Sequence, residues 1–177
     1  MDQPCWRTLR VHARPGQRPH GGWLLAGALR LPVALGRAGL VTLKREGDGA
    51  TPRGRFRPVR LWWRADAGGR PRTGLPVRRI SGSDAWCEDP ADRRYNRPMR
   101  LPDGGVGDRL WRSDHLYDLV VEIDHNCRPR VKGRGSAIFI HVARPDLAPT
   151  AGCVALPAAG LRRLLARLCA KTSIRIG

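Results

Sequence analysis

Glycine and proline break the apolar stretches of this chain into short runs, which restricts it to a fold made mainly of short strands. The 177 residues include 21 glycines and 15 prolines, and the turn signals recur at the short intervals typical of strand-rich domains. A chain of this length can bury about two-thirds of its unfolded surface in one core, so a single domain over residues 1–177 is expected. Short strands are predicted at residues 8–11, 23–28, 31–35, 40–44 and 56–63.

Two further strands and one helix are indicated nearer the C-terminus. Residues 117–124 alternate apolar and acidic side chains, which predicts a half-buried strand. Residues 137–142 are continuously apolar except for one histidine, as in a strand covered on both faces. Residues 157–168 carry leucines at helical spacing after Pro157 and predict the one helix. Residues 65–107 show little periodicity and predict an irregular insertion, of the kind that often forms the wall of a site.

The net charge of +18 comes from 33 Lys and Arg against 15 Asp and Glu. An excess this large favours polyanionic partners such as nucleic acid. Almost all of it is arginine spread along the chain, however, and a bias toward arginine codons explains that equally well. Aromatic residues are too few to form stacking platforms, and no nucleic-acid-binding motif occurs. An Arg-rich nucleic-acid-binding module is therefore kept as the alternative outside enzymes, and stable nucleic-acid binding is not expected.

Membrane and secretory segments are not readable in the sequence. The longest apolar candidate, residues 23–41, is interrupted by arginine, proline and glycine, so no transmembrane segment is expected. The N-terminus lacks the long apolar core and the cleavage site of a secretory signal. Export, if it occurs, would need either a signal that these residues do not show or another route.

The number and spacing of the five cysteines limit which metal sites and disulfides the chain can form. They are widely and unequally spaced without a CxxC pair, so no metal site is expected. Their odd number leaves at least one free thiol, which is either a buried apolar group or a reactive one. A Cys87–Cys127 pairing stays open, as do the states of Cys5 and Cys169.

One thiol stands beside features that could make it reactive. The segment from His141 to Cys153 joins the predicted buried strand to the helix through a loop with two prolines and one glycine. Gly152 would let backbone N–H groups approach a substrate oxygen, as an oxyanion hole requires. The loop could fold back so that imidazole and thiol meet, which would lower the pKa of the thiol. From spacing alone, a strand-end histidine and a buried structural thiol are the alternative interpretation.

The stretch SAIFIHVARPDLAPTAGCVALP resembles the catalytic segment of the YkuD family of L,D-transpeptidases, where a histidine at a strand end precedes a [S/T]xGC motif. That motif is TAGC here, from Thr150 to Cys153. The stretches KREGDGATPRGRF and SDAWCEDPADRRYNRP resemble an early loop and a further block of compact, stand-alone members, so the likeness runs from about residue 8. Two departures are Ala151, where many members have a second histidine, and the apolar residues 154–156, where many have a polar one.

The resemblance implies a compact β-sandwich or barrel with one principal helix packed after the catalytic loop. It implies a cysteine acyltransferase without metal or other cofactor, in which His141 deprotonates Cys153 and the N–H groups of Gly152 and Cys153 hold the oxyanion. The partners would be peptidoglycan stem peptides, with diaminopimelate or L-alanine of the stem as donor. An L,D-carboxypeptidase or amidase of the same fold is the alternative within this chemistry. A periplasmic monomer that carbapenems acylate is the further expectation.

Candidate substrate contacts lie in the catalytic loop and in the predicted insertion. Arginine suits the carboxylates of stem peptides because its planar guanidinium can make two parallel hydrogen bonds. A loop pinned by its aromatic residues is the alternative interpretation of the insertion. The candidates are Thr150 and Arg144 in the loop and Trp86, Tyr95, Asn96 and Arg97 in the insertion.

Overall fold

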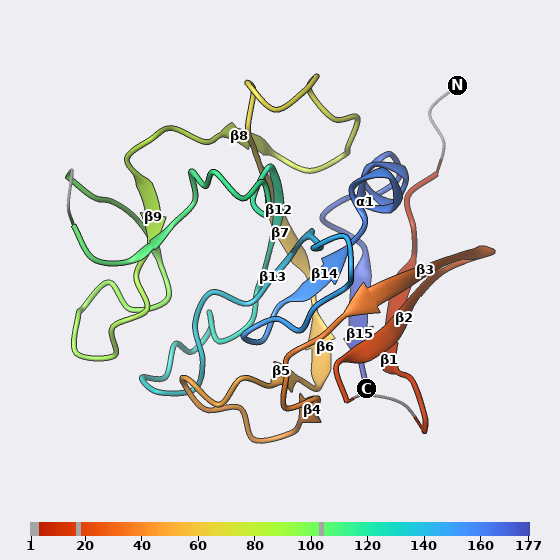
Figure 1. Ribbon diagram of the computed structural model, residues 1–177, viewed down its shortest axis with the longest axis horizontal. Helices are drawn as coiled ribbons and strands as arrows, with labels where there is room; N and C mark the ends of the chain where they lie inside the picture. The colour runs from red at the N-terminus through yellow and green to blue at the C-terminus, as the bar shows by residue number, and fades with distance from the viewer. Residues whose placement is uncertain (1–3, 17–18, 103–104) are drawn as a thin grey trace.

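Strands dominate the structure, as the frequent turn signals predict. The computed structural model describes residues 4–16, 19–102 and 105–177, and within them one helix, α1 (Ala158–Leu165), lies against a curled sheet (Figure 1). A mainly β fold with one principal helix is therefore confirmed. The strands are β1 (Thr8–Ala13), β2 (Gly21–Ala26), β3 (Leu29–Ala34), β4 (Leu40–Val41), β5 (Thr51–Pro52), β6 (Gly54–Phe56), β7 (Pro58–Trp63), β8 (Val77–Arg79), β9 (Asp84–Trp86), β10 (Pro98–Arg100), β11 (Asp108–Arg109), β12 (Leu119–Ile123), β13 (Phe139–Val142), β14 (Val154–Leu156) and β15 (Ser173–Ile176).

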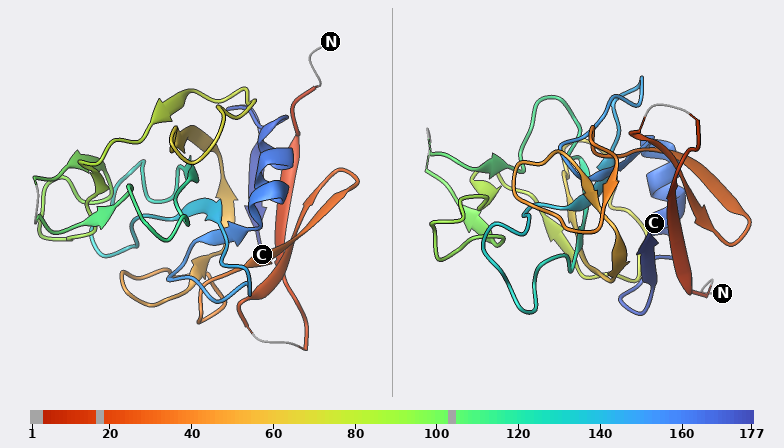
Figure 2. Two further views of the ribbon diagram at one scale, coloured as in Figure 1. Left: turned by 45° about the horizontal axis from the view of Figure 1, so that its top comes forward. Right: turned by 90° about the horizontal axis from the view of Figure 1, so that it is seen from below.

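Ten strands form one sheet in the order β6-β15-β1-β2-β3-β14-β13-β12-β7-β8. The sheet is strongly twisted, and α1 covers part of one face (Figure 2). Near its middle, β13 and β14 run parallel. Parallel neighbours need a crossover of about a dozen residues, and residues 143–153 supply it. The separation between His141 and Cys153 is therefore a requirement of this topology.

The predicted irregular insertion at residues 65–107 contains regular structure, which the sequence did not indicate. It includes β8, β9 and β10, and the last two join β11 in a three-stranded sheet. Each strand has only three residues or fewer, too short for any periodicity to appear. Residues 103–104 of the insertion lie outside the described part of the chain.

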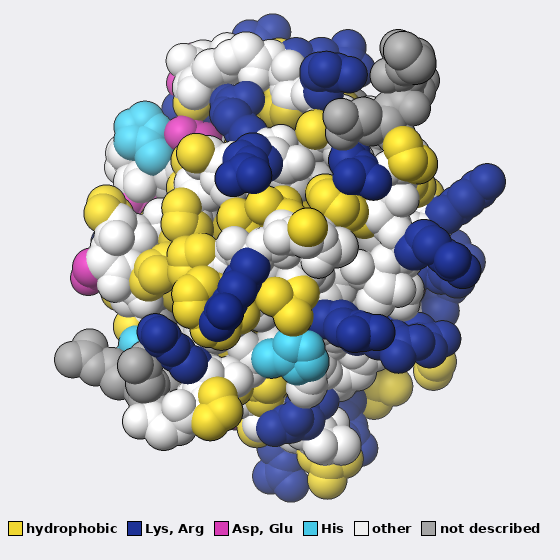
Figure 3. All heavy atoms as spheres, turned by 90° about the vertical axis from the view of Figure 1, so that its right-hand side faces the viewer, with side chains coloured by type: hydrophobic (Ala, Val, Ile, Leu, Met, Phe, Trp, Pro, Cys, Tyr) yellow, Lys and Arg dark blue, Asp and Glu magenta, His cyan; other side chains and the backbone are white. Residues whose placement is uncertain are grey.

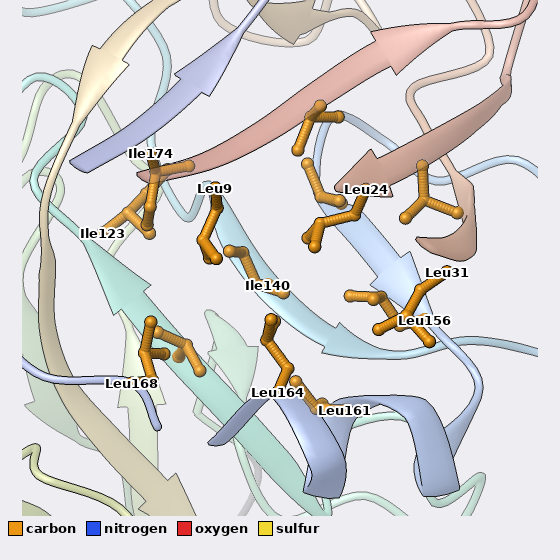
Figure 4. Packing of buried hydrophobic residues seen from close by; sticks show 14 of the residues in the cluster. Leu9, Leu24, Leu31, Ile123, Ile140, Leu156, Leu161, Leu164, Leu168 and Ile174 are labelled. Carbon is orange, nitrogen blue, oxygen red and sulfur yellow. The ribbon is translucent and has the colours of Figure 1, made fainter. Parts of the chain in front are cut away.

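The main core lies between the sheet and α1. Leucines at positions 161, 164, 165 and 168 are fully buried, so the predicted helical stripe is confirmed. They meet side chains from both halves of the sheet, including Leu9, Ile140 and Leu156 (Figure 4). Burial of a leucine stabilises the fold by about 1.5–3 kcal/mol.

A second, smaller core covers the opposite face of the sheet. It packs Trp62, Trp86 and Phe139 against Val120. The prediction that β12 is half-buried is therefore wrong, because all five of its residues are buried. Even Glu122 is enclosed, where its carboxylate accepts a hydrogen bond from Trp62 Nε1 at 3.0 Å, and burial raises its pKa.

A disulfide joins Cys5, ahead of β1, to Cys169, between α1 and β15. It spans 164 residues of sequence and ties together the segments that lead into two neighbouring strands. Cys87 and Cys127 are both free, so the pairing left open between them is not formed. In the described part of the chain, no helix is long and apolar enough to cross a membrane.

Candidate active site

Strand pairing places Cys153 and His141 on the same face of the sheet. Side chains alternate along β13, so Phe139 and His141 face one side and Ile140 the other. The parallel register pairs Ile140 with Val154, which puts Cys153 beside Phe139. The thiol and the imidazole therefore project from adjacent strands into the same region, about two residues apart along the strand direction.

Both side chains line a cavity of about 550 Å³. Its wall mixes opposite charges with the backbone of the loop that ends at Cys153. No cluster of His, Cys, Asp or Glu in residues 4–16, 19–102 and 105–177 could hold a metal ion. The charged lining residues are Arg37, Lys44, Arg112 and Arg144 among the cations and Glu46, Glu88 and Asp108 among the acids.

The Cys153 thiol is buried and held by backbone groups. Its Sγ–H donates to the carbonyl oxygen of Ala137 at 3.1 Å, and the N–H of Phe139 donates to Sγ at 3.3 Å. Burial raises the pKa of Cys153 to about 12, and the backbone hydrogen bond from Phe139 offsets only part of this rise. The predicted lowering of this pKa is therefore wrong for the free protein, because desolvation of a thiolate here outweighs the Phe139 hydrogen bond and the charge of Lys44.

The His141 imidazole is neutral and oriented as a base. Nδ1 lies 2.8 Å from the carbonyl oxygen of Val142. Because a carbonyl can only accept, Nδ1 must carry the proton and Nε2 the lone pair. Burial lowers the pKa of His141 to about 4, and the ring of Tyr117 packs edge-on against it at 5.2 Å. The hydrogen bonds of the Cys153 thiol and the His141 ring all go to backbone groups. Among the described contacts, no hydrogen bond joins the thiol directly to the imidazole.

The turn before the thiol is closed by Thr150. Its Oγ1 donates to the carbonyl oxygen of Cys153 at 2.7 Å and accepts the N–H of Gly152 at 3.1 Å. Gly152 has φ +151°, and a Cβ there would lie 2.9 Å from the carbonyl oxygen of Ala50 and 3.0 Å from Ile138 Cδ1. Glycine is thus required for packing at this position. The Gly152 N–H, expected as an oxyanion donor, is engaged within the turn.

A second layer of backbone holds this turn in place. Thr51 Oγ1 accepts the N–H of Gly36 at 2.8 Å and donates to the carbonyl oxygen of Cys153 at 3.4 Å. The N–H of Thr150 donates to Leu35 at 2.9 Å, and that of Arg37 donates back to Thr150 at 3.0 Å. Thr51 lies in the early loop that carried part of the resemblance, but nothing in its sequence context singled it out.

An acidic wall faces the thiol, and the sequence pattern did not indicate it. Asp108 accepts a hydrogen bond from Tyr117 Oη at 2.9 Å and lies 3.6 Å from Arg112. Burial raises the pKa of Asp108. Burial, with the nearby charges of Asp108 and Glu46, raises the pKa of Glu88 to about 7. The density of charge between residues 108 and 118 was the only available signal.

The predicted substrate residues separate into two groups. Thr150 and Arg144 line the cavity. Trp86, Tyr95 and Asn96 are buried outside its lining, and Arg97 is exposed elsewhere.

The second group fits the alternative of a pinned loop. Trp86 Nε1 donates to Asn96 Oδ1 at 3.0 Å, and Tyr95 Oη donates to the Glu46 carboxylate. Asn96 Oδ1 also accepts the N–H of Ala137 at 3.3 Å. Since the carbonyl of Ala137 accepts the Cys153 thiol, Asn96 supports the backbone that positions the sulfur.

Comparison with known proteins gives a family and one related structure. The YkuD model, described as an L,D-transpeptidase catalytic domain, matches residues 20–176. The chain is also similar to L,D-transpeptidase 1 of Mycobacterium tuberculosis, with 12% identity and a TM-score of 0.39, over 96% of this chain and 61% of that one. It thus spans about three-fifths of that protein's length. No curated protein matches the chain.

Proposed function

Because the chain belongs to the YkuD family of L,D-transpeptidases, we propose that it cross-links peptidoglycan stem peptides through an acyl-enzyme on Cys153. The observation that carries this proposal is the placement of a thiol and a neutral imidazole on neighbouring strands of one cavity. The chemistry needs no metal or other cofactor. Since its substrate is peptidoglycan, we place the protein outside the cytoplasm, in the periplasm.

The first step transfers a proton as the sulfur attacks. His141 Nε2 takes the Sγ proton while sulfur bonds to the donor carbonyl carbon, so that a free thiolate with a pKa of about 12 need not accumulate. This requires Cys153 to rotate from its bond with Ala137 toward the imidazole. The tetrahedral intermediate then collapses, and the amine of the departing residue leaves with the proton held by His141. A thioester on Cys153 results.

The second step consumes an amine. The amino group of another stem peptide attacks the thioester carbon, His141 accepts its proton, and the sulfur leaves and is reprotonated. We assign the oxyanion to backbone N–H groups at Cys153 and Gly152. The Gly152 donor becomes available when its 3.1 Å bond to Thr150 Oγ1 is released, so turn opening would accompany substrate binding.

The mixed charge of the cavity suits two different ligand groups. Arg37 and Arg144 can bind the carboxylates of the donor stem. Glu88 and Asp108 can hold the ammonium of the acceptor. Because the pKa of Glu88 is about 7, its carboxylate can also remove the proton that an ammonium must lose before it attacks. The donor is diaminopimelate or L-alanine of the stem.

The test is incubation with purified muropeptides, followed by mass spectrometry. Cross-linked dimers are expected from the wild type and none from Cys153→Ala. Cys127→Ala is the matched control, since Cys127 is a second free thiol outside the cavity. Shortened monomers without dimers would establish the carboxypeptidase or amidase alternative. Dimers from Cys153→Ala would overturn the proposal.

A further inference from the structure

Five consecutive strands of the sheet carry no acidic residue. Strands β6, β15, β1, β2 and β3, which are consecutive in the sheet, contain no Asp or Glu, and neither does α1. Figure 3 views this side and shows Lys and Arg across it, with Asp and Glu confined to one margin. A codon bias toward arginine would not by itself remove the acids from one side.

The register of these strands aligns their arginines. Arg55 pairs with Arg175, Arg175 pairs with Arg10, Arg10 pairs with Leu25, and Leu25 pairs with Arg30. Their neighbours Phe56, Ile174, Leu9 and Leu24 are buried, so alternation directs the row outward. All four arginines are exposed. We call Arg55, Arg175, Arg10 and Arg30 the arginine row.

Within the isolated protein this arrangement is unfavourable. Like charges directly opposite each other on neighbouring strands destabilise a sheet. None of the four arginines has a carboxylate within ion-pair distance among the residues that the structure describes. The row spans roughly 19 Å, four strand spacings of about 4.8 Å. Its charge is therefore extended, solvent-facing and without an ion-pair partner, which suits an anionic surface of similar width.

The apolar side chains beside the row discriminate between anionic partners. Leu25 lies in the row, and the guanidinium carbons of Arg30 and Arg14 lie over the Trp23 ring, 3.9 and 5.2 Å from its centroid. A ring already in contact with guanidinium groups is less available to stack on a nucleobase, as a single-strand platform requires. Arginine, tryptophan and leucine together are instead typical of surfaces that lie in the headgroup region of a bilayer.

We propose that the arginine row and the adjoining Trp23 and Leu25 form a docking surface for a membrane that exposes anionic phospholipid headgroups. The phosphates would compensate the four guanidinium groups, and the apolar side chains would enter the headgroup boundary. Docking would hold the enzyme at the surface of a bilayer. The docking surface is separate from the residues that line the catalytic cavity, and binding there does not depend on the reaction.

The test is co-sedimentation of the full chain with vesicles. Binding is expected with phosphatidylglycerol in phosphatidylcholine but not with phosphatidylcholine alone, and it should weaken as salt is added. The variant R10Q/R55Q/R175Q should partition on the order of 100-fold more weakly, from about a fivefold loss per cation. The control R70Q/R93Q/R100Q removes the same charge at exposed positions outside the row and should bind nearly as the wild type does.

Three outcomes would overturn the proposal. They are equal binding to neutral vesicles, equal weakening by the control variant, and tighter binding to duplex DNA that is lost in R10Q/R55Q/R175Q. Cross-linking of soluble muropeptides is measured on the same samples and should be unchanged in both variants. An inactive wild type that still binds vesicles would defeat the proposed reaction and leave this surface standing.

Discussion

The catalytic cavity and the arginine row handle charge in opposite ways. In the cavity, acids and cations line the same wall, and Asp108 accepts a hydrogen bond from Tyr117 and lies near Arg112. In the row, Arg55, Arg175 and Arg10 stand in direct register, and none of them has an ion-pair partner among the described residues. Part of the cavity's charge is compensated within the protein, whereas the row is open to compensation from outside. One region is prepared for chemistry and the other for contact.

Burial accounts for the difference. Uncompensated charges cannot be kept inside a protein, so the buried thiol and imidazole are neutral, as the pKa values of about 12 and about 4 indicate. On the surface, water screens like charges and the cost of aligning them is small. The net charge of +18 does not tell buried, paired charges from exposed, aligned ones. The strand register shows which arginines are aligned on the surface.

Loss of the nucleophile should have the largest effect on cross-linking and should not change vesicle binding by the arginine row. Cys153→Ala is expected to lower cross-linking by roughly 10⁴-fold or more, because no other free thiol lines the described cavity. A carbapenem should add covalently to the wild type and not to this variant. Intact-mass spectra check the adduct, and vesicle co-sedimentation checks that docking persists. An adduct on Cys153→Ala would refute the assignment.

The neutral state of the thiol can be tested without substrate. With a pKa of about 12, Cys153 should be alkylated by iodoacetamide at pH 8 about a thousandfold more slowly than an exposed cysteine with a pKa of about 8.5. The rate should rise with pH throughout the accessible range. Peptide mass spectrometry follows Cys153 and Cys127 separately. A plateau near neutral pH would mean that a thiolate–imidazolium pair exists in the free enzyme.

Removal of the disulfide should affect the side that bears the row. Cys5→Ser/Cys169→Ser is expected to lower the free energy of unfolding by about 2–5 kcal/mol, since the bond closes a loop of 164 residues. The carbapenem adduct on Cys153 should still form at temperatures where the variant is folded. Thermal and denaturant unfolding, with and without reductant, provide the measurement. A wild type whose stability is unaffected by reductant would contradict this expectation.

Local patterns were sufficient to predict the elements around the site. The apolar run ending in His141 predicted β13, the leucine stripe predicted α1, and the match of the YkuD model to residues 20–176 confirms the family that TAGC suggested. These features depend on neighbours in sequence or on one motif. They located the loop between His141 and Cys153, although not the state of either side chain.

Features that depend on distant contacts were not predictable. Glu122 occupies an acidic position in the alternating pattern of residues 117–124, which predicts a solvent-facing side chain. The second core buries it instead. The partner of Cys5 is set by the adjacency of β1 and β15. Asp108 and Tyr117 meet because β11 and the segment before β12 converge on the cavity. In each case the deciding neighbour lies far along the chain or in an element too short to leave a pattern.

The acidic wall of the cavity should control the acceptor rather than the donor. Asp108→Asn is expected to raise KM for the acceptor stem peptide about tenfold, the loss of one charged hydrogen bond, with little change for the donor. Because the Asp108 charge raises the pKa of Cys153, the variant should also be alkylated faster. Asp89→Asn removes the same charge outside the cavity and is the control. Equal changes in both variants would mean a general electrostatic effect.

The smallest effect tests the premise of the row itself. Arg175→Glu converts two like-charged pairs, with Arg55 and with Arg10, into opposite-charged pairs. The free energy of unfolding at low salt should rise by about 0.2–1 kcal/mol per pair, and the gain should shrink as salt screens it. Arg93→Glu, exposed outside the sheet, should give no such gain. The same change also removes positive charge from the docking surface. A variant that is more stable but binds anionic vesicles more weakly would show that the row lowers the stability of the free protein and that the membrane supplies the compensating charge.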